Sequence, residues 1–360
     1  MSSRRALIVG AVALGCGRAA PPAAGPAPAV GVLGESVRLR ADDPVPAASP
    51  WLVDGEVRVV AARGETIGLV VRHPAGEPVA VRPPVGVTAR TYAVDWLSVV
   101  RPSTAMYGGS RGAGRYADGL TEGAAPTTDP AYVELAVARD AAPGSARGEL
   151  AIGARRLPIA LTIAPVTLPP LPAWVWAYTN PAELVWARTD ELACVAALRA
   201  RGVLLAPDVA LEDWPGRRHL FAGVRDVPVW ISSDPATAAA QVRGFVAAFA
   251  GTGQVPFAIP IDEPHTPADR ARVRALADAV RAAGGGPTTF RYAVTDEPHP
   301  EYGDAIDLYI SLRARLDEDP ARRWTYNGAP PRAGAMVLDA EAPGLRTWGW
   351  IGWRWRIPVW

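Results

Sequence analysis

A proline-rich segment over residues 165–172 separates two different patterns of apolar residues. Before this segment, short runs of apolar and β-branched residues are broken by Gly, Pro and Asp. That pattern predicts an all-β sandwich over residues 31–168. After it, segments with the apolar spacing of strands alternate with segments with the apolar spacing of helices. This alternation predicts a parallel sheet within residues 173–360. Because proline fixes φ and cannot donate to a strand ladder, the segment itself predicts a stiff linker.

The spacing of the apolar residues also predicts the individual strands and helices. In the first part we expect strands at residues 36–39, 57–61, 66–72, 132–138, 149–152 and 157–164, and a Gly-rich loop over 107–123. In the second part we expect strands at residues 173–178, 203–206, 227–231, 257–261, 290–294, 306–310 and 324–326. Helices are expected between them at residues 189–201, 236–249 and 266–284. The last helix has the strongest signals, because Thr266 suits an N-cap, Pro267 the first turn and Gly284 the end.

Alternating strands and helices allow either a closed barrel or an open Rossmann-type sheet. No Gly-rich phosphate loop follows the first strand, which argues against the Rossmann fold. The expected fold class is therefore α/β plus all-β: an N-terminal β-sandwich followed by a TIM-type (β/α)8 barrel over residues 173–360. Only seven strands are found, and the chain ends on an aromatic, apolar segment at residues 354–360. These two features predict a barrel that lacks its last strand.

Residues 1–30 have the pattern of an export signal followed by a tether. Arg4 and Arg5 precede an apolar run over residues 6–14, which is too short to span a bilayer permanently. Residues 12–16 resemble a bacterial lipobox with Cys16 as the lipidated residue, and an ordinary signal peptide with an incidental cysteine is the alternative. We therefore predict an exported protein, either secreted or a cell-envelope lipoprotein. Its only expected contact with a membrane is a lipid anchor at Cys16.

The composition narrows the classes of function. A formal net charge of +1 argues against nucleic-acid binding, which usually needs a basic face. The remaining cysteine, Cys194, lies in an expected helix and suits a small buried hydrophobe. No Cys or His residues have metal-ligand spacing, so neither a metal nor another cofactor is expected. The 13 Trp and 9 Tyr residues are compatible with sugar binding, but equally with cores and interfaces.

The strongest candidate for chemistry is the adjacent acidic pair Asp262 and Glu263. It directly follows the expected strand at residues 257–261, and catalytic residues of barrels lie at the carboxyl ends of strands. Adjacent acids cannot easily flank a sugar ring, so they favour a reaction in which the substrate supplies the nucleophile. The alternative is a pair of acids that stabilises a helix N-terminus. A second Asp-Glu-Pro-His, at residues 296–299, shows that the motif need not be catalytic.

Several short motifs, in their order and spacing, resemble glycoside hydrolase family 123 and the related uncharacterised family that shares its catalytic domain. The resemblance extends over nearly the whole chain after the export segment. The motifs lie at residues 64–66, 114–120, 142–148, 261–264, 324–327 and 346–355. The segment at residues 261–264 matches the catalytic Asp-Glu of that family.

The resemblance implies hydrolysis of β-linked N-acetylhexosamine, specifically N-acetylgalactosamine, by substrate-assisted catalysis. Asp262 would orient the 2-acetamido group, and Glu263 would be the general acid and then the base. Four further residues would line the site for the glycan substrate, with barrel packing as the alternative for each: Tyr292, Trp324, Tyr326 and Asn327. Two other functions stay open, a non-catalytic carbohydrate-binding surface lipoprotein of the same fold and a fragment without independent function.

Overall fold

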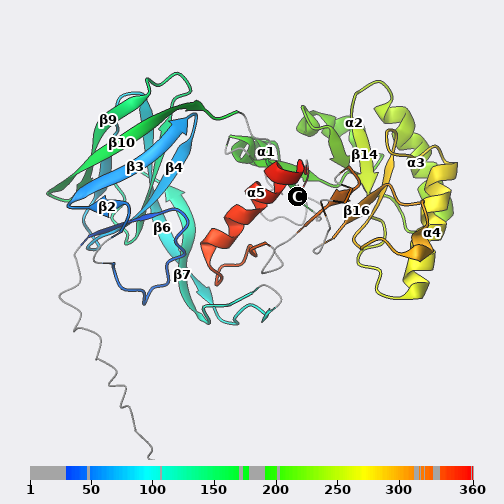
Figure 1. The fold of residues 1–360 in the computed structure, drawn as a ribbon, viewed down its shortest axis with the longest axis horizontal. Coiled ribbons are helices and arrows are strands. Elements are labelled where there is room, and N and C mark those ends of the chain that lie inside the picture. Colours follow the sequence, from blue (N-terminus) through cyan, green and yellow to red (C-terminus); the bar gives the residue numbers. More distant parts are fainter. Residues whose placement is uncertain are drawn as a thin grey trace, which may run out of the picture.

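The computed structural model describes residues 30–46, 49–105, 108–169, 173–177, 191–200, 203–311, 316, 318–319, 321–326, 333–357 and 359. Cys16, the predicted export segment and Asn327 lie outside the described residues. Figure 1 shows a sheet-rich part formed by the first half of the chain and a mixed part formed by the second half. No helix among the described residues is long and apolar enough to cross a membrane.

The first part consists of two five-stranded sheets. One sheet has the order β1 (Gly31–Gly34), β4 (Thr66–Arg72), β8 (Ala131–Val137), β6 (Val87–Val99) and β7 (Gly114–Glu122). The other has the order β2 (Leu52–Val53), β3 (Glu56–Arg63), β10 (Arg155–Thr167), β9 (Gly144–Ile152) and β5 (Val79–Arg82). Alternate residues of β8 are buried, as expected for a strand with one face on a core. A single apolar cluster draws on both sheets, so their inner faces pack together.

The second part contains parallel strands with helices packed on one side. Strands β11 (Ala173–Ala177) and β12 (Val203–Pro207) form a two-stranded sheet. A five-stranded sheet has the order β13 (Asp226–Pro228), β14 (Val255–Ala258), β15 (Arg291–Val294), β16 (Leu308–Ile310) and β17 (Arg323–Trp324). The helices are α1 (Glu191–Arg199), α2 (Trp214–Arg217), α3 (Pro235–Phe249), α4 (Pro267–Ala282) and α5 (Arg346–Trp355).

The predicted fold class was wrong, because the described residues form no (β/α)8 barrel. A barrel requires every strand to be hydrogen-bonded on both sides. Among the described residues, β17 pairs only with β16, and β11 pairs only with β12. A single parallel bridge between Val209 and Val229 is the link between the two parallel sheets. The outcome is an open parallel sheet, with five short helices in the whole described chain.

The five-stranded sheet is strongly curved. Phe257 on β14 and Trp324 on β17 are three strands apart, which would separate their backbones by about 14 Å in a flat sheet. Their rings nevertheless meet edge to face, with centroids 5.3 Å apart. The side chains of β14 and β17 therefore approach each other across a concave face.

The two faces of this sheet have separate cores. Tyr292 and Val294 of β15 belong to the large cluster that includes Val242 of α3 and Val273 of α4. Ala293, between them, belongs to a smaller cluster on the opposite face, which also contains Phe257, Trp324 and Val359. Helices therefore cover the convex face, and residues near position 359 pack against the concave face.

Helix α4 begins as the sequence predicts. The Thr266 hydroxyl accepts a hydrogen bond from the Asp269 N–H, and the Asp269 carboxylate accepts one from the Thr266 N–H. This reciprocal arrangement satisfies two backbone donors at the start of the helix. Since Thr266 follows the acidic pair by only a few residues, the cap also fixes where the chain leaves the edge of the sheet.

The two parts of the molecule are joined by a buried carboxylate. Asp339 accepts hydrogen bonds from the Ser103 N–H at 2.8 Å, from the Ser103 hydroxyl at 2.6 Å and from the Ser110 hydroxyl. Its own carbonyl accepts a hydrogen bond from the Arg111 N–H at 2.7 Å. Burial would raise the pKa of Asp339, but these donors outweigh it and lower the pKa to about 2.

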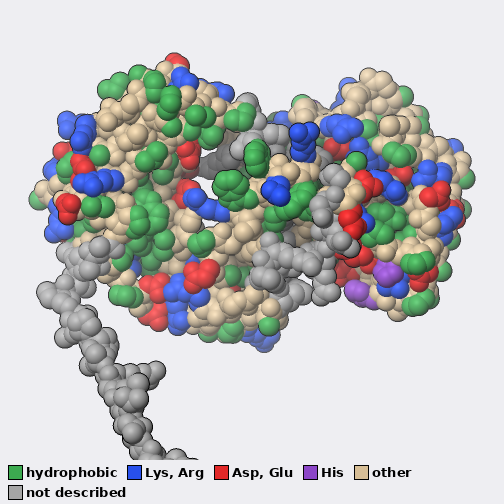
Figure 2. All heavy atoms as spheres, viewed as in Figure 1, with side chains coloured by type: hydrophobic (Ala, Val, Ile, Leu, Met, Phe, Trp, Pro, Cys, Tyr) green, Lys and Arg blue, Asp and Glu red, His purple; other side chains and the backbone are tan. Residues whose placement is uncertain are grey.

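Helix α5 lies between the two parts (Figure 1). Arg346 at its start forms an ion pair with Glu35 at 2.8 Å. Trp350 and Trp353 are exposed, and Figure 2 shows hydrophobic side chains at the surface in this region. The helix therefore touches the first part through its amino end and leaves indole rings in solvent.

Candidate functional site

The acidic pair lies just beyond β14, at the edge of the sheet where the parallel strands end. The residue that joins it to the sheet is Thr295, the first residue after β15. The Thr295 hydroxyl accepts a hydrogen bond from the Glu263 N–H at 2.6 Å and donates one to Oδ1 of Asp262 at 2.7 Å. Because β14 and β15 are parallel neighbours, their carboxyl ends meet and this bridge can form.

Glu263 combines a strained backbone with an accessible side chain. Its φ is +42°, a left-handed conformation that is uncommon for a residue other than glycine. Its side chain is 47% exposed. The Tyr326 hydroxyl donates a hydrogen bond to Oε1 at 2.5 Å, and His265 Nε2 lies 3.9 Å from Oε2. Strained residues of this kind concentrate at functional sites, so Glu263 is the leading candidate.

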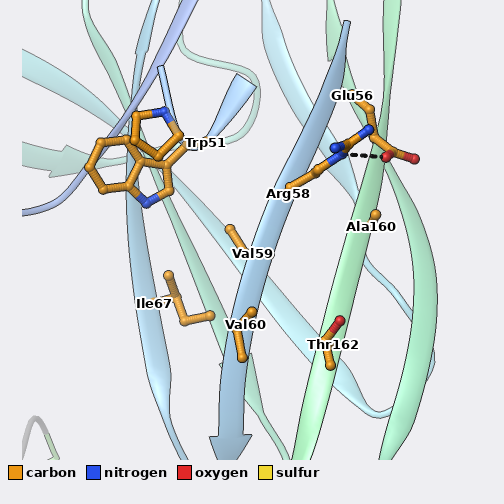
Figure 3. Close-up of a pocket in the computed structure, with 9 residues that line it drawn as sticks. Trp51, Glu56, Arg58, Val59, Val60, Ile67, Ala160 and Thr162 are labelled. Carbon is orange, nitrogen blue, oxygen red and sulfur yellow. Dashed lines mark hydrogen bonds and ion pairs between the residues drawn. The ribbon is translucent and has the colours of Figure 1, made fainter. Parts of the chain in front are cut away.

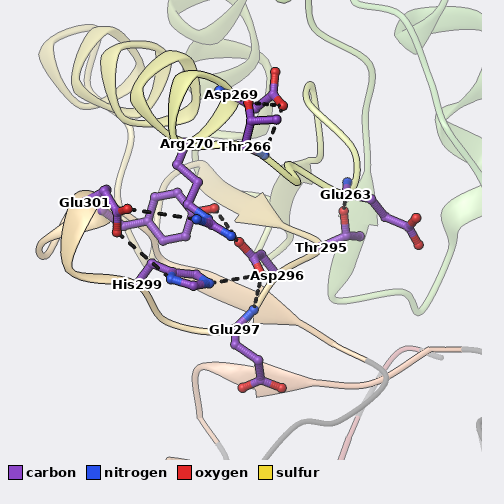
Figure 4. A network of polar contacts seen from close by, with 10 residues as sticks. Glu263, Thr266, Asp269, Arg270, Thr295, Asp296, Glu297, His299 and Glu301 are labelled. Carbon is purple, nitrogen blue, oxygen red and sulfur yellow. Dashed lines mark hydrogen bonds and ion pairs between the residues drawn. The ribbon is translucent and has the colours of Figure 1, made fainter.

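The second Asp-Glu-Pro-His lies in the equivalent register of the next strand. Phe257 pairs with Arg291, and the same offset carried five residues further aligns Asp262 with Asp296. Figure 4 shows that Asp296 is the centre of a polar network. Its carboxylate accepts hydrogen bonds from the Glu297 N–H at 2.8 Å and the Tyr302 hydroxyl at 2.6 Å.

Further side chains contact the two acids of the second motif. Arg270 and His299 both lie within ion-pair distance of the Asp296 carboxylate. Burial and the hydrogen bond to Asp296 raise the pKa of Tyr302, which keeps its hydroxyl a donor. Glu297 accepts from Ser311 at 2.5 Å and pairs with Arg323 at 3.6 Å. Each carboxylate of the second pair therefore has an arginine partner, whereas neither carboxylate of the first pair has one among the described residues.

The structure brings together only part of the predicted sugar site. Tyr326 contacts Glu263, as described above. Tyr292 is 1% exposed and points into the helix-facing core, where burial raises the pKa of its hydroxyl. Trp324 is 3% exposed and packs against Phe257 on the concave face. Both side chains contribute packing in this structure, and their predicted contacts with a sugar stay predictions.

Thr295 is the site residue that we did not predict. Its hydroxyl contacts both members of the acidic pair, yet the residue lies 33 positions beyond Asp262 in the chain. One signal was present in the sequence: Thr295 is the first polar residue after an apolar strand, directly before the second Asp-Glu-Pro-His. Its partner could not be read from that signal, because the register between the two strands was unknown.

A hollow away from the acidic pair is lined mainly by residues of β3 and β10 and also by Ile67 of β4 (Figure 3). It has a volume of about 490 Å³, and Trp51 and Val60 are among its lining residues. Its single acid, Glu56, is held by Arg58 at 2.9 Å and by Arg147. This hollow offers no free acid or base. Among the described residues, no group of three or more His, Cys, Asp or Glu side chains is arranged to hold a metal ion.

The sequence matches no protein-family model and no curated protein. One solved structure, a family 123 glycoside hydrolase from Clostridium perfringens, is similar over 87% of this chain and 74% of its own, with a TM-score of 0.55 and 10% identity. The chain shares its fold with a family 123 glycoside hydrolase. The resemblance expected from the sequence motifs is thus confirmed at the level of the fold.

Two further solved structures match less well. Domains 4 and 5 of the S-layer protein SbsC match 29% of this chain and 40% of their own, with a TM-score of 0.18 and 11% identity. Amylomaltase from Corynebacterium glutamicum matches 58% of this chain and 22% of its own, with a TM-score of 0.15 and 13% identity. At these scores neither structure bears on the fold or the function.

Proposed function

We propose that this protein is an exported glycoside hydrolase that cleaves β-linked N-acetylhexosamine, with N-acetylgalactosamine as the preferred sugar. The observation that carries the proposal is the difference between the two acidic pairs. Both oxygens of Asp296 accept hydrogen bonds, while Asp262 keeps Oδ2 without a donor among the described residues. Asp296 and Glu297 each pair with an arginine, whereas neither Asp262 nor Glu263 does so among the described residues. The shared fold with a family 123 glycoside hydrolase supports the same reaction class.

In the proposed reaction the substrate provides the nucleophile. The carbonyl oxygen of the 2-acetamido group attacks the anomeric carbon as the glycosidic bond breaks, and Glu263 gives its proton to the leaving oxygen. Asp262 accepts a hydrogen bond from the acetamido N–H and stabilises the positive charge of the oxazolinium intermediate. The Glu263 carboxylate then takes a proton from the water that opens the intermediate. The hydrogen bond from Tyr326 to Oε1 leaves Oε2 for this proton.

Two parts of this proposal rest on the sequence. Export is supported by Arg4, Arg5 and the apolar run that follows them, and a lipid anchor at Cys16 is supported by the lipobox-like segment. The choice of glycan is supported by the similar family 123 glycoside hydrolase from Clostridium perfringens, which hydrolyses glycolipid glycans. We therefore propose a cell-envelope or secreted enzyme whose substrates include glycans of glycolipids.

The decisive test is a Glu263→Gln variant assayed on a nitrophenyl N-acetyl-β-galactosaminide. Glutamine keeps the shape of the side chain and an acceptor for Tyr326 but cannot carry the catalytic proton. We expect kcat to fall by on the order of 10²–10⁴-fold. Glu297→Gln is the matched control, because it makes the same change in the second motif, and its kcat should stay within about threefold of wild type.

Two results would contradict the proposal. Turnover by Glu263→Gln at the wild-type rate would show that Glu263 is not the general acid and base. A wild-type protein that retains the glycan on a column without cleaving it would instead be a carbohydrate-binding protein of the same fold.

A further inference from the structure

We propose that Thr295 is the positioning residue of the acidic pair, and that its single hydroxyl sets the geometry of both acids at once. The inference rests on the proposed hydrolase function for its kinetic consequence, but its geometric basis is independent of that function. Thr295 acts through Asp262 and Glu263 and has no contact of its own with the reacting atoms in this assignment.

The hydrogen bonds of Thr295 have only one consistent direction. A hydroxyl carries one proton and two lone pairs, and a backbone N–H can only donate. The Thr295 oxygen must therefore accept from the Glu263 N–H, which leaves its proton for Oδ1 of Asp262. Thr295 is 8% exposed, so water competes little for either bond. One buried hydroxyl thus links the backbone of one acid to the side chain of the other.

The first consequence concerns Glu263. Its φ of +42° is an unfavourable conformation for a residue other than glycine and persists only where the surroundings enforce it. The bond from its own N–H to Thr295 is an interaction that acts directly on this dihedral angle. Figure 4 shows the Glu263 carboxylate directed away from Thr295 and from the Asp296 network. The strained turn therefore points Glu263 outward, where Tyr326 meets it.

The second consequence concerns Asp262. The donation from Thr295 fixes Oδ1, and no other described residue donates a hydrogen bond to this carboxylate. Oδ2 is left as the acceptor for a substrate N–H, in a plane that Thr295 determines. Without the hydroxyl, Asp262 could rotate about its terminal torsion, which has a broad energy profile. The transition state would then lose its alignment, while the rest of the sugar would bind as before.

The test compares Thr295→Val, which keeps the shape and removes the hydroxyl, with Thr295→Ser, which keeps the hydroxyl. We expect Thr295→Val to lower kcat by on the order of 10²-fold, because small misplacements of reacting groups have effects of this size. KM should change by less than about threefold, since the interaction acts mainly in the transition state. Thr295→Ser should restore most of kcat, a rescue that a merely structural role would not explain.

The matched control is Thr289→Val. Thr289 precedes the same strand at its opposite end, and its hydroxyl donates to the Gly284 carbonyl at 2.8 Å. Its removal should leave kcat unchanged. Crystal structures of the two Thr295 variants complete the test: Glu263 should leave the left-handed region in Thr295→Val and keep it in Thr295→Ser.

The outcomes separate this inference from the proposed function. If the wild-type protein cleaves the substrate and Thr295→Val keeps its kcat, the positioning role is overturned and the function stands. If the wild-type protein cleaves no N-acetylhexosaminide, the function fails and the crystal structures decide the inference. An unchanged Glu263 backbone in Thr295→Val would then overturn it, and a relaxed backbone would support it.

Discussion

Asp262 and Asp296 follow two neighbouring strands, β14 and β15, yet their carboxylates have different surroundings. Asp296 accepts from Tyr302 and from a backbone N–H, and Arg270 lies beside it. Asp262 accepts from Thr295 alone among the described residues. A tetrapeptide motif therefore has no fixed role: what decides it is whether neighbouring elements supply donors to the carboxylates.

This difference predicts that the same change, Tyr to Phe, lowers kcat at one position and stability at the other. Tyr326→Phe removes the donor to Glu263, and the loss of about 1 kcal/mol of alignment should lower kcat by roughly five- to tenfold. Tyr302→Phe removes the donor to Asp296 and should instead lower the free energy of unfolding by about 1–3 kcal/mol. Steady-state kinetics and urea unfolding of both variants measure this. A loss of kcat in Tyr302→Phe without a loss of stability would contradict the structural role assigned to Tyr302.

The position of the acidic pair at the end of a strand could be predicted from the sequence, whereas the hydrogen bonds that the pair forms could not. An apolar strand followed by Asp262 and Glu263 is visible in the sequence, and the structure places both at the end of the sheet. Thr295 became a partner through strand register, which is a property of the folded chain. Tyr326 was expected in the site, but its hydrogen bond to Glu263 depends on the curvature of the sheet. The burial of Tyr292 has the same origin, since its position near a strand end did not reveal which face it would occupy.

At the scale of elements, the three predicted helices correspond to α1, α3 and α4, and most of the predicted strands are present. The long strand β6 was not predicted. Helix α4 was predicted closely, because its cap residues Thr266 and Asp269 act on the backbone next to them. The strand expected at residues 36–39 was wrong, since a turn ends at Ser36 and residues 37–39 have no regular secondary structure before an isolated bridge at Arg40. Local signals succeed where the stabilising contact is also local.

Strand β7 shows the opposite case. Its glycines led us to expect an irregular loop over residues 107–123, but residues Gly114–Glu122 pair with β6. A Cβ at Gly114 would lie 2.7 Å from Nε of Arg40, and one at Gly119 would lie 3.1 Å from the Cβ of Asp95. Glycine lets neighbouring side chains approach closely here, a reason that cannot be recognised before the partners are known.

Removing the cap of α4 should have a measurable cost. Thr266→Ala removes the acceptor for the Asp269 N–H, and we expect the free energy of unfolding to fall by about 1 kcal/mol. Arg272→Ala is the control on the same helix, because Arg272 forms only an exposed ion pair at 3.8 Å and should change stability by less than about 0.5 kcal/mol. Urea unfolding at neutral pH compares them. Equal stability of Thr266→Ala and wild type would show that the cap is dispensable.

At the scale of the whole molecule, the parallel strands were predicted correctly, but the prediction that they form a barrel was wrong. Alternating strand and helix patterns are the same for an open sheet and for a barrel, because both satisfy the local period. Closure depends on whether the first and last strands meet, and β17 and β11 do not pair among the described residues. The strong curvature between Phe257 and Trp324 is nevertheless enough to bring Tyr326 to Glu263.

The link between the two parts predicts a specific pH dependence. The pKa of Asp339 is lowered from its ordinary value of 3.8 to about 2 in the folded protein. Its contribution to stability, about 2 kcal/mol, is therefore fully present above roughly pH 5 and is lost as the pH falls through about 2. Asp339→Asn should be less stable than wild type at pH 7, and the difference should shrink toward pH 2.

Urea unfolding at several pH values measures this difference. Asp118→Asn is the control, because Asp118 forms an ion pair with Arg38 from an exposed position and should show little change. A stability difference for Asp339→Asn that is the same at pH 7 and pH 3 would contradict the assignment.

The Asp339 contact also has a consequence for biosynthesis. Ser103 and its partner carboxylate are separated by 236 residues, so the acceptor leaves the ribosome long after the strands of the first part have emerged. The paired sheets can form during translation, but Ser103 and Ser110 can donate to Asp339 only after residue 339 has also left the ribosome. The contact between the two parts is therefore a late step of folding on the ribosome, after the first part has been able to fold.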